Sequence, residues 1–310
     1  MVDISVVVPV YGCPEALRPL YERVRETMDR IQKSFELVLV NDACPKGSWK
    51  IIEELCHEDK RVMGIDLSRN FGQIHSTNAG IDEAKGEYIV LMDCDLQDRP
   101  EGIEDLFLEI EKGYDIVFAR RMDRKDNAMV LFFSKTFYRI YNHFTEGYYD
   151  GDVGNFCIVR KKVVDEYRQI KDNNKSFTAM LSWMGYKVSK IDIEAEKRFE
   201  GKSSYTFSKK VDMAIDMLTS QSNKPLKAII KLGFVIAALA FVYLVIQIIN
   251  YFVSSNVTEG WTSIIAAIFL MGGITLVCLG GVGIYVGNIF SQTKGFPAYL
   301  IREKINGDKK

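Results

Sequence analysis

Residues 88–98 read Tyr-Ile-Val-Leu-Met-Asp-Cys-Asp-Leu-Gln-Asp, an apolar run followed by three closely spaced carboxylates. Residues 88–92 form an apolar run, which is typical of a buried strand in a parallel sheet. The run ends on Asp93 and Asp95, which would point to the same side of an extended backbone. Two carboxylates aimed at one spot repel each other unless a cation lies between them, and their oxygens suit Mg²⁺ or Mn²⁺. An isolated Asp-x-Asp is more often a pair of solvated acids, so the metal interpretation depends on the rest of the chain.

Similar apolar runs recur earlier and later in the chain, separated by segments whose apolar residues have helical spacing. Such an alternation predicts a doubly wound α/β domain with a mostly parallel sheet and right-handed crossovers. Strands are expected at residues 4–10, 35–40, 62–67, 88–92 and 116–119. Helices are expected between them at residues 15–31, 49–56, 74–84 and 103–111.

Polar residues follow four of the predicted strands at the point where each strand ends. They are Tyr11, Asp42, residues 68–70 and the acid pair after residue 92. Ligands of open α/β sheets bind outside the carboxyl ends of the strands. We therefore expect these residues to lie on one rim of the sheet, an arrangement that scattered surface polarity would not produce.

The composition argues against several classes of protein. The 310 residues carry a net charge of −1, which gives no indication of nucleic-acid binding. No metal-site spacing is found among the histidines (His57, His75 and His143) or among the cysteines. A secretory signal would carry positive charge near the N-terminus, where this chain has Asp3. The six cysteines are therefore expected to be free thiols in a reducing compartment. They are Cys13, Cys44, Cys56, Cys94, Cys157 and Cys278.

Two apolar stretches near the C-terminus predict membrane spans. Residues 232–249 contain one strongly polar side chain, Gln247, and residues 261–290 contain no charge. Each stretch is long enough to cross a bilayer as a helix, and the alternative is a pair of buried helices in a soluble domain. The connector at residues 250–260 lacks Lys and Arg, whereas both flanks carry them, so both termini are expected in the cytoplasm.

Apolar residues also recur at helical spacing over residues 211–218, beside charged ones. This segment is either an amphipathic helix on the membrane surface or a helix that faces the core of the soluble domain. Gly283 and Gly287 have a spacing that lets helices approach closely. The predicted organisation is a cytoplasmic domain at 1–208, a juxtamembrane segment at 209–227, and a two-helix membrane hairpin with a cytoplasmic tail at 228–310.

The chain resembles the family 2 glycosyltransferases of the polyprenyl-phosphate branch, relatives of dolichyl-phosphate mannose synthase and bacterial undecaprenyl-phosphate glucosyltransferases. Six segments in the right order carry the resemblance. They are Val-Val-Val-Pro-Val-Tyr (6–11), Leu-Val-Leu-Val-Asn-Asp (37–42), Leu-Ser-Arg-Asn-Phe-Gly-Gln (67–73), Asp-Cys-Asp-Leu-Gln-Asp (93–98), Asp-Val-Gly-Asn-Phe (152–156) and Arg-Phe-Glu-Gly-Lys-Ser-Ser-Tyr (198–205). The resemblance implies a Rossmann-like glycosyltransferase A-type domain. The chain departs from the family at Gly12-Cys13 and at Ala43-Cys44-Pro45, which leaves its base and sugar preference open.

The resemblance and the chemistry together assign roles to named residues. Asp95, with Asp93 and Gln97, is expected to hold Mg²⁺ or Mn²⁺, which would neutralise the diphosphate leaving group. The catalytic residues are expected to be Asp95, Asp152, Arg198 and Lys202. The nucleotide sugar is expected to contact Pro9, Tyr11, Asp42, Arg69, Asn70, Asp93 and Arg120, with Asp42 reading the base. The acceptor is expected to contact Arg198, Lys202, Ser203 and Tyr205.

The predicted activity is inverting transfer of one sugar from a nucleoside diphosphate, UDP in particular, to polyprenyl phosphate. The acceptor would be undecaprenyl phosphate at the cytoplasmic face of a bacterial inner membrane, and the product would serve cell-envelope glycosylation. A lipid phosphate is already anionic and needs cations more than a general base. The resemblance implies a homo-oligomer, such as a tetramer. The alternatives are a membrane glycosyltransferase with another lipid or glycan acceptor, and a non-catalytic membrane-tethered protein that binds nucleotide sugars.

Overall fold

The structure is a computed structural model that describes residues 2–121, 153–194 without residue 174, residue 196, single residues between 226 and 249, and residues 260–307. The chain divides into two compact units. The first unit contains residues 1–142, 147–204 and 296–310, and the second contains residues 143–146 and 205–295.

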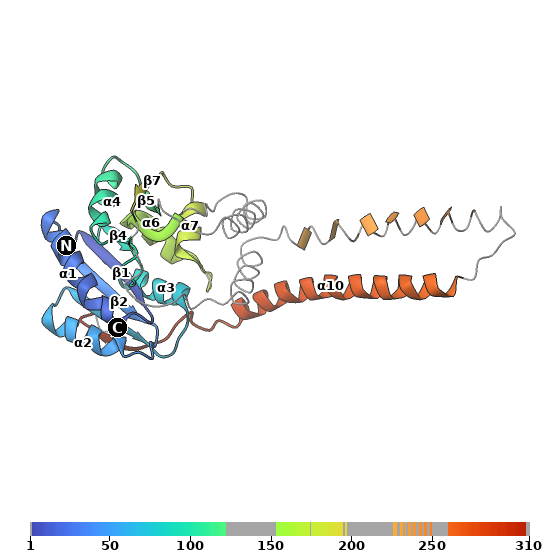
Figure 1. Cartoon of the computed structure of the whole chain (residues 1–310), viewed down its shortest axis with the longest axis horizontal. Coiled ribbons are helices and arrows are strands. Elements are labelled where there is room, and N and C mark those ends of the chain that lie inside the picture. Colours follow the sequence, from blue (N-terminus) through green and yellow to red (C-terminus); the bar gives the residue numbers. More distant parts are fainter. Residues whose placement is uncertain are drawn as a thin grey trace. The chain divides into compact units, whose positions relative to one another are not determined.

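Within the described residues, the first unit is built on one sheet of eight strands. Figure 1 labels several of these strands and the helices beside them. The strands are β1 (Ile4–Val10), β2 (Phe35–Asn41), β3 (Val62–Leu67), β4 (Tyr88–Leu91), β5 (Ile116–Arg121), β6 (Val153–Arg160), β7 (Val188–Ile193) and β8 (Ile301–Ile305). Their order across the sheet is β7-β5-β6-β4-β1-β2-β3-β8. Strands β6 and β8 run antiparallel to their neighbours, and the other pairs are parallel. The predicted α/β fold with a mostly parallel sheet is confirmed.

Helices cover both faces of this sheet. They are α1 (Pro14–Arg30), α2 (Ser48–Glu58), α3 (Gln73–Glu83), α4 (Gly102–Ile110), α6 (Lys161–Gln169) and α7 (Phe177–Trp183). Along β1, Val6 and Val8 join an apolar cluster with α1, α2 and α4, whereas Val7 joins a second cluster with α3, α6 and α7. This alternation places one apolar core on each face, as expected for a strand buried on both sides.

Helix α3 packs unusually close to the sheet, and this close approach requires a glycine. A Cβ added at Gly80 would lie 2.4 Å from a methyl carbon of Val7 and 3.0 Å from one of Val40. Both distances are below ordinary contact, so a larger side chain would push α3 away from β1 and β2. The position of α3 matters because its N-terminal end borders the polar rim described below.

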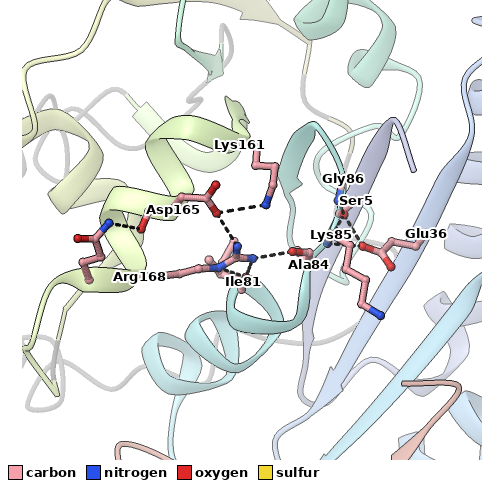
Figure 2. Close-up of polar contacts among 10 residues, drawn as sticks. Ser5, Glu36, Ile81, Ala84, Lys85, Gly86, Lys161, Asp165 and Arg168 are labelled. Atoms are coloured by element: carbon pink, nitrogen blue, oxygen red, sulfur yellow. Dashed lines mark hydrogen bonds and ion pairs between the residues drawn. The ribbon is translucent and has the colours of Figure 1, made fainter. Parts of the chain in front are cut away.

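The C-terminal end of α3 is held by α6 (Figure 2). Arg168 of α6 donates Nη2 hydrogen bonds to the Ile81 carbonyl at 2.6 Å and to the Ala84 carbonyl. Helix ends leave carbonyls without partners, so the guanidinium caps α3. In the same figure, Ser5 and Glu36 accept backbone N–H groups of Lys85 and Gly86. These contacts fix the connection between α3 and β4.

In the second unit, α10 (Trp261–Thr293) contains Leu270–Phe290, a stretch of 21 residues with mean hydropathy 1.8. This stretch is long and apolar enough to cross a membrane, and it is the one such helix among the described residues. The other predicted span, residues 232–249, is described only in part, so two spans remain a prediction. The juxtamembrane segment 209–227 lies almost wholly outside the described residues.

Candidate functional site

The expected rim exists, and its first member is Asp42 at the end of β2. The two carboxylate oxygens of Asp42 accept the backbone N–H groups of Phe71 and Gly72 at 2.7 and 2.9 Å. Asp42 is buried, and Gly72 has a φ of 95°, a conformation that favours glycine. Asp42 therefore fixes the loop between β3 and α3. Its predicted contact with a base remains a prediction.

The acid pair follows β4, with Asp93 in an irregular segment and Asp95 in the turn after it. The strand ends at Leu91 rather than at residue 92, and Asp95 lies in the turn, where its Oδ1 accepts the Gln97 N–H at 3.1 Å. Leu96 has a φ of 57° with a buried side chain. An extended backbone therefore does not set the directions of the two carboxylates. The turn sets them, with Leu96 in a left-handed conformation that is unusual for a branched residue.

Two side-chain amides orient Asp93. Its Oδ1 accepts hydrogen bonds from Gln73 Nε2 at 2.8 Å and from Asn155 Nδ2 at 3.2 Å. Gln73 begins α3 and Asn155 lies in β6, so three elements meet at this carboxylate. Sequence reasoning assigned neither amide a role, although both lie in the segments that carry the family resemblance. Their polarity alone did not distinguish them from surface residues.

The donor atoms at the rim fit a hard divalent cation. Asp93, Asp95 and Gln97 offer oxygen ligands, the type that Mg²⁺ and Mn²⁺ prefer. Over the described residues, no group of three or more His, Cys, Asp or Glu side chains gathers as a metal site. Mg²⁺ is commonly held by one or two carboxylates and completed by substrate phosphates, so two acids and an amide suit that mode better than a closed protein cage.

The cysteines correct the sequence prediction, because Cys13 and Cys94 form a disulfide. They lie 81 residues apart in the chain, but β1 and β4 are neighbours, so the residues that follow these strands meet at the rim. Within the part of the chain that is described, Cys44, Cys56, Cys157 and Cys278 are free thiols, as expected. Burial raises the pKa of the Cys44 thiol, but hydrogen bonds that include one from the Gly12 N–H outweigh burial and lower it overall.

The other predicted donor residues occupy different parts of the rim. Tyr11 follows β1 and is about half exposed, at 49%, whereas Pro9 is buried within the strand. Arg69 and Asn70 are exposed, and the Arg69 guanidinium lies 4.1 Å from the centre of the Phe71 ring. These residues are accessible to a ligand above the sheet, apart from Pro9.

Arg120 has a protein partner. Its Nη2 donates to Asp192 Oδ2 at 2.9 Å, and its Nε donates to the other oxygen of the same carboxylate. This ion pair joins β5 to β7 near their carboxyl ends. A contact between Arg120 and a substrate would have to compete with this pair or be shared with it.

The remaining predicted site residues lie outside the described residues. They are Asp152, Arg198, Lys202, Ser203 and Tyr205.

His75 lies beside the loop that Asp42 fixes, and its ring contacts Phe71 edge-on with 6.5 Å between centres. Burial lowers the pKa of His75, and this effect outweighs the opposite influence of Asp42. Its Nδ1 is buried without a hydrogen-bond partner among the described residues. The imidazole is therefore neutral near pH 7 and contributes no positive charge to the rim.

Comparison with known proteins agrees with this architecture. The chain matches glycosyl transferase family 2 over residues 5–168. It is 34% identical to the uncharacterized glycosyltransferase YkcC of Bacillus subtilis, over 100% of this chain and 96% of that protein. It is 30% identical to the SfII prophage-derived bactoprenol glucosyl transferase of Shigella flexneri, over 98% of this chain and 99% of that protein.

A third relative is the undecaprenyl-phosphate 4-deoxy-4-formamido-L-arabinose transferase of Proteus mirabilis. It is 31% identical over 99% of this chain and 95% of its own length. The similarity thus extends over the whole chain, including α10 and the strand after it. The family match and these relatives confirm the resemblance that the motifs indicated. The chain belongs to glycosyl transferase family 2, in the branch whose members are named for bactoprenol and undecaprenyl phosphate.

Proposed function

We propose that this chain transfers one sugar from a UDP-sugar to undecaprenyl phosphate at the cytoplasmic face of the membrane. The observation that carries the proposal is the rim itself. Asp42 holds the loop at residues 68–72, and Gln73 and Asn155 orient Asp93 in the segment after β4. This loop and this segment lie at the same edge of the sheet. The relatives named for bactoprenol and undecaprenyl phosphate match this chain over nearly its whole length, which supports a lipid phosphate as acceptor.

The donor would lie across this rim. The loop that contains Arg69 and Asn70, together with Tyr11 and Pro9, would surround the nucleotide, and Asp42 would keep the loop backbone in place. Asp93, Asp95 and Gln97 would hold Mg²⁺ or Mn²⁺. When bound, such an ion supplies Lewis-acid stabilisation of the charge that develops on the diphosphate. Gln73 and Asn155 orient Asp93 without neutralising it, because amides are uncharged donors.

The acceptor phosphate would attack the anomeric carbon in line with the departing diphosphate, which inverts that centre. One phosphate oxygen forms the new C1–O bond as the bond between C1 and the diphosphate oxygen breaks, and the nucleoside diphosphate leaves. Two anionic reactants must approach each other, so cations are needed beside them. We assign this role to Arg198 and Lys202, with Ser203 and Tyr205 beside them, and we assign Asp152 to orienting the donor sugar.

The same proposal places the enzyme in the inner membrane, with two spans and both termini in the cytoplasm. The apolar stretch in α10 supports one of these spans. We also propose a homo-oligomer, on the family resemblance alone. The product, a sugar linked to polyprenyl phosphate, would serve as a donor for glycosylation of the cell envelope.

The test is a transfer assay with the purified full chain in detergent, using undecaprenyl phosphate and a panel of UDP-sugars and GDP-sugars. We expect one UDP-sugar to be transferred in the presence of Mg²⁺ or Mn²⁺, and EDTA to abolish the reaction. Asp95→Ala should slow transfer by about 100- to 1000-fold, the loss expected when one stabiliser of developing charge is removed. Asp105→Ala, an exposed acid on α4, is the matched control and should keep full activity.

Three outcomes would count against parts of this proposal. Full activity of Asp95→Ala in EDTA would remove the metal assignment. Transfer to a glycan or to another lipid, with none to undecaprenyl phosphate, would favour a different acceptor. Tight binding of a UDP-sugar without turnover on any acceptor would favour the non-catalytic alternative.

A further inference from the structure

Strand β8, which follows α10 in sequence, lies beside β3, the strand that leads into the loop at residues 68–72. Strand β8 pairs antiparallel with β3, from Gly64 opposite Ile305 to Leu67 opposite Ile301. The register shifts between Asp66 and Leu67, where the regular pairing ends. One further backbone hydrogen bond continues beyond this point, from the Ser68 N–H to the Leu300 carbonyl at 2.9 Å. The tail thus reaches the first residue of the loop at 68–72.

Arg302 of β8 makes two contacts at this point with one guanidinium group. Its Nη1 donates to Asp66 Oδ2 at 3.1 Å, and its Nη2 donates to the Ser68 carbonyl at 2.7 Å. Asp66 is 2% exposed, so its charge is poorly solvated and depends on such partners. The fork of a guanidinium can serve a carboxylate and a carbonyl together, which a single ammonium does less well.

The contact with Asp66 extends into the end of β2. The second oxygen of Asp66 accepts a hydrogen bond from Asn41 Nδ2 at 2.7 Å, and Asn41 Oδ1 accepts the Cys44 N–H at 3.2 Å. Asn41 directly precedes Asp42, the residue that holds the backbone of Phe71 and Gly72. Arg302 is therefore linked to the loop at 68–72 in two ways: directly at its start, and through Asp66 and the end of β2 at its other end.

We infer that Arg302 is a positioning residue for the donor site: it holds the loop at 68–72, and hence Arg69 and Asn70, in the conformation that receives the nucleotide. Arg69 and Asn70 are exposed, so their location depends on the pinned residues on either side of them. A loop that is already ordered loses less conformational entropy when a ligand binds. This inference rests on the proposed function for the identity of the ligand, but not for the ordering of the loop.

The experiment compares three variants of the full chain in detergent. Arg302→Ala removes both contacts. Arg302→Lys keeps a positive charge for Asp66 but not the fork. Lys304→Ala is the matched control, because Lys304 lies two residues along the same strand and pairs with Glu83 at 2.8 Å, away from the loop. Each variant is measured by thermal unfolding, by hydrogen exchange of the Phe71 and Gly72 amides, by UDP titration, and by donor KM and kcat.

We expect Arg302→Ala to raise the donor KM and the UDP Kd by about tenfold while kcat changes little, because supporting contacts of a site commonly contribute this much. Exchange of the Phe71 and Gly72 amides should accelerate in the same variant. Arg302→Lys should recover more of the thermal stability than of the UDP affinity. Lys304→Ala should lower stability but leave the donor KM and the exchange of these amides unchanged.

Two results would overturn the inference. One is equal loss of UDP affinity in Arg302→Ala and Lys304→Ala, since that would make the effect one of general stability. The other is unchanged exchange at Phe71 and Gly72 in Arg302→Ala, or in Arg302→Lys if the alanine variant does not fold. Failure of the unaltered chain to bind UDP would count against the proposed donor instead, and the exchange measurement would still decide whether Arg302 orders the loop.

Discussion

At the scale of single residues, two acids of the rim differ in the groups that they contact. Asp42 is buried, and both of its oxygens accept backbone N–H groups of the next loop. Asp93 instead accepts from the side chains of Gln73 and Asn155. An amide donor orients a carboxylate without cancelling its charge, so Asp93 retains the negative charge that a cation would need.

His75 gives a prediction of pH dependence at this scale. Burial lowers its pKa from the ordinary value of 6.5, so the unfolded chain binds the proton more readily than the folded chain. The contribution of neutral His75 to the free energy of unfolding is therefore complete above pH 6.5. It falls as the pH drops toward the pKa of the folded state, by at most about 1.4 kcal/mol per pH unit. Thermal unfolding at pH 7.5 and 5.5 should show a smaller drop for His75→Gln than for the unaltered chain.

The control for this measurement is His57→Gln, because His57 is exposed on α2, away from the rim. It removes a histidine that lies apart from the loop at 68–72, so its pH-dependent change is the reference for His75→Gln. If His75→Gln loses stability at low pH as strongly as the unaltered chain, the titration of His75 does not contribute and other groups must account for the change.

At the scale of secondary-structure elements, the site exists because the ends of separate strands meet at one edge. Strands β1, β2, β3 and β4 run in the same direction, and a polar residue or turn follows each of them. Glycine at position 80 lets α3 approach β1, and Arg168 caps the far end of α3. The N-terminal end of α3, which begins with Gln73, is thereby held beside the acid turn.

The disulfide between the ends of β1 and β4 is tested by reduction. In the chain-entropy account, a cross-link between cysteines 81 residues apart in sequence stabilises the fold by about 4.5 kcal/mol. Because two of the six cysteines are joined, thiol titration of the denatured chain should count four free cysteines before reduction and six after it. The reduced protein should also unfold at a lower temperature.

The double variant Cys13→Ser/Cys94→Ser serves as the control, and its unfolding temperature should not respond to the reductant. Six reactive thiols in the denatured chain without any reductant would show that the two cysteines are not linked in the protein as purified. In that case the original expectation of free thiols would hold for these two residues as well.

At the scale of the whole molecule, two compact units share one chain, and the tail of the chain belongs to the first unit. Residues 296–310 group with the sheet rather than with α10, and Asn306 closes β8 by donating to the carbonyls of Cys56 and Val62. After α10 the chain thus returns to the first unit. Residues 301–306 are therefore an integral part of the sheet unit.

Membrane topology gives the prediction at this scale. A cysteine placed at Ser255, in the connector between the predicted spans, should react with a membrane-impermeant thiol reagent added to intact cells. The unaltered chain is the control, because Cys44, Cys56 and Cys157 are buried and Cys278 lies in α10. Labelling confined to inside-out vesicles would reverse the proposed orientation, and extraction of the protein without detergent would contradict the membrane assignment.

Local sequence pattern was enough to predict several features of this protein. Continuous apolar runs predicted β1 to β5 with small differences at their ends, because a strand buried on both faces leaves a simple signal. The same runs located the rim, since parallel strands share one carboxyl edge. The ordered motifs also identified the family, which the comparison confirmed.

The order of the strands across the sheet is a property of the tertiary fold, and most of the unexpected features follow from that order. Strand β4 lies beside β1 rather than β3, and this joins Cys13 to Cys94. Strand β8 is short, mostly exposed and rich in charge, so no apolar pattern distinguishes it, and its pairing with β3 brings Arg302 to Asp66 across more than two hundred residues. Such contacts depend on the order of strands in the sheet, which local propensity and periodicity do not encode.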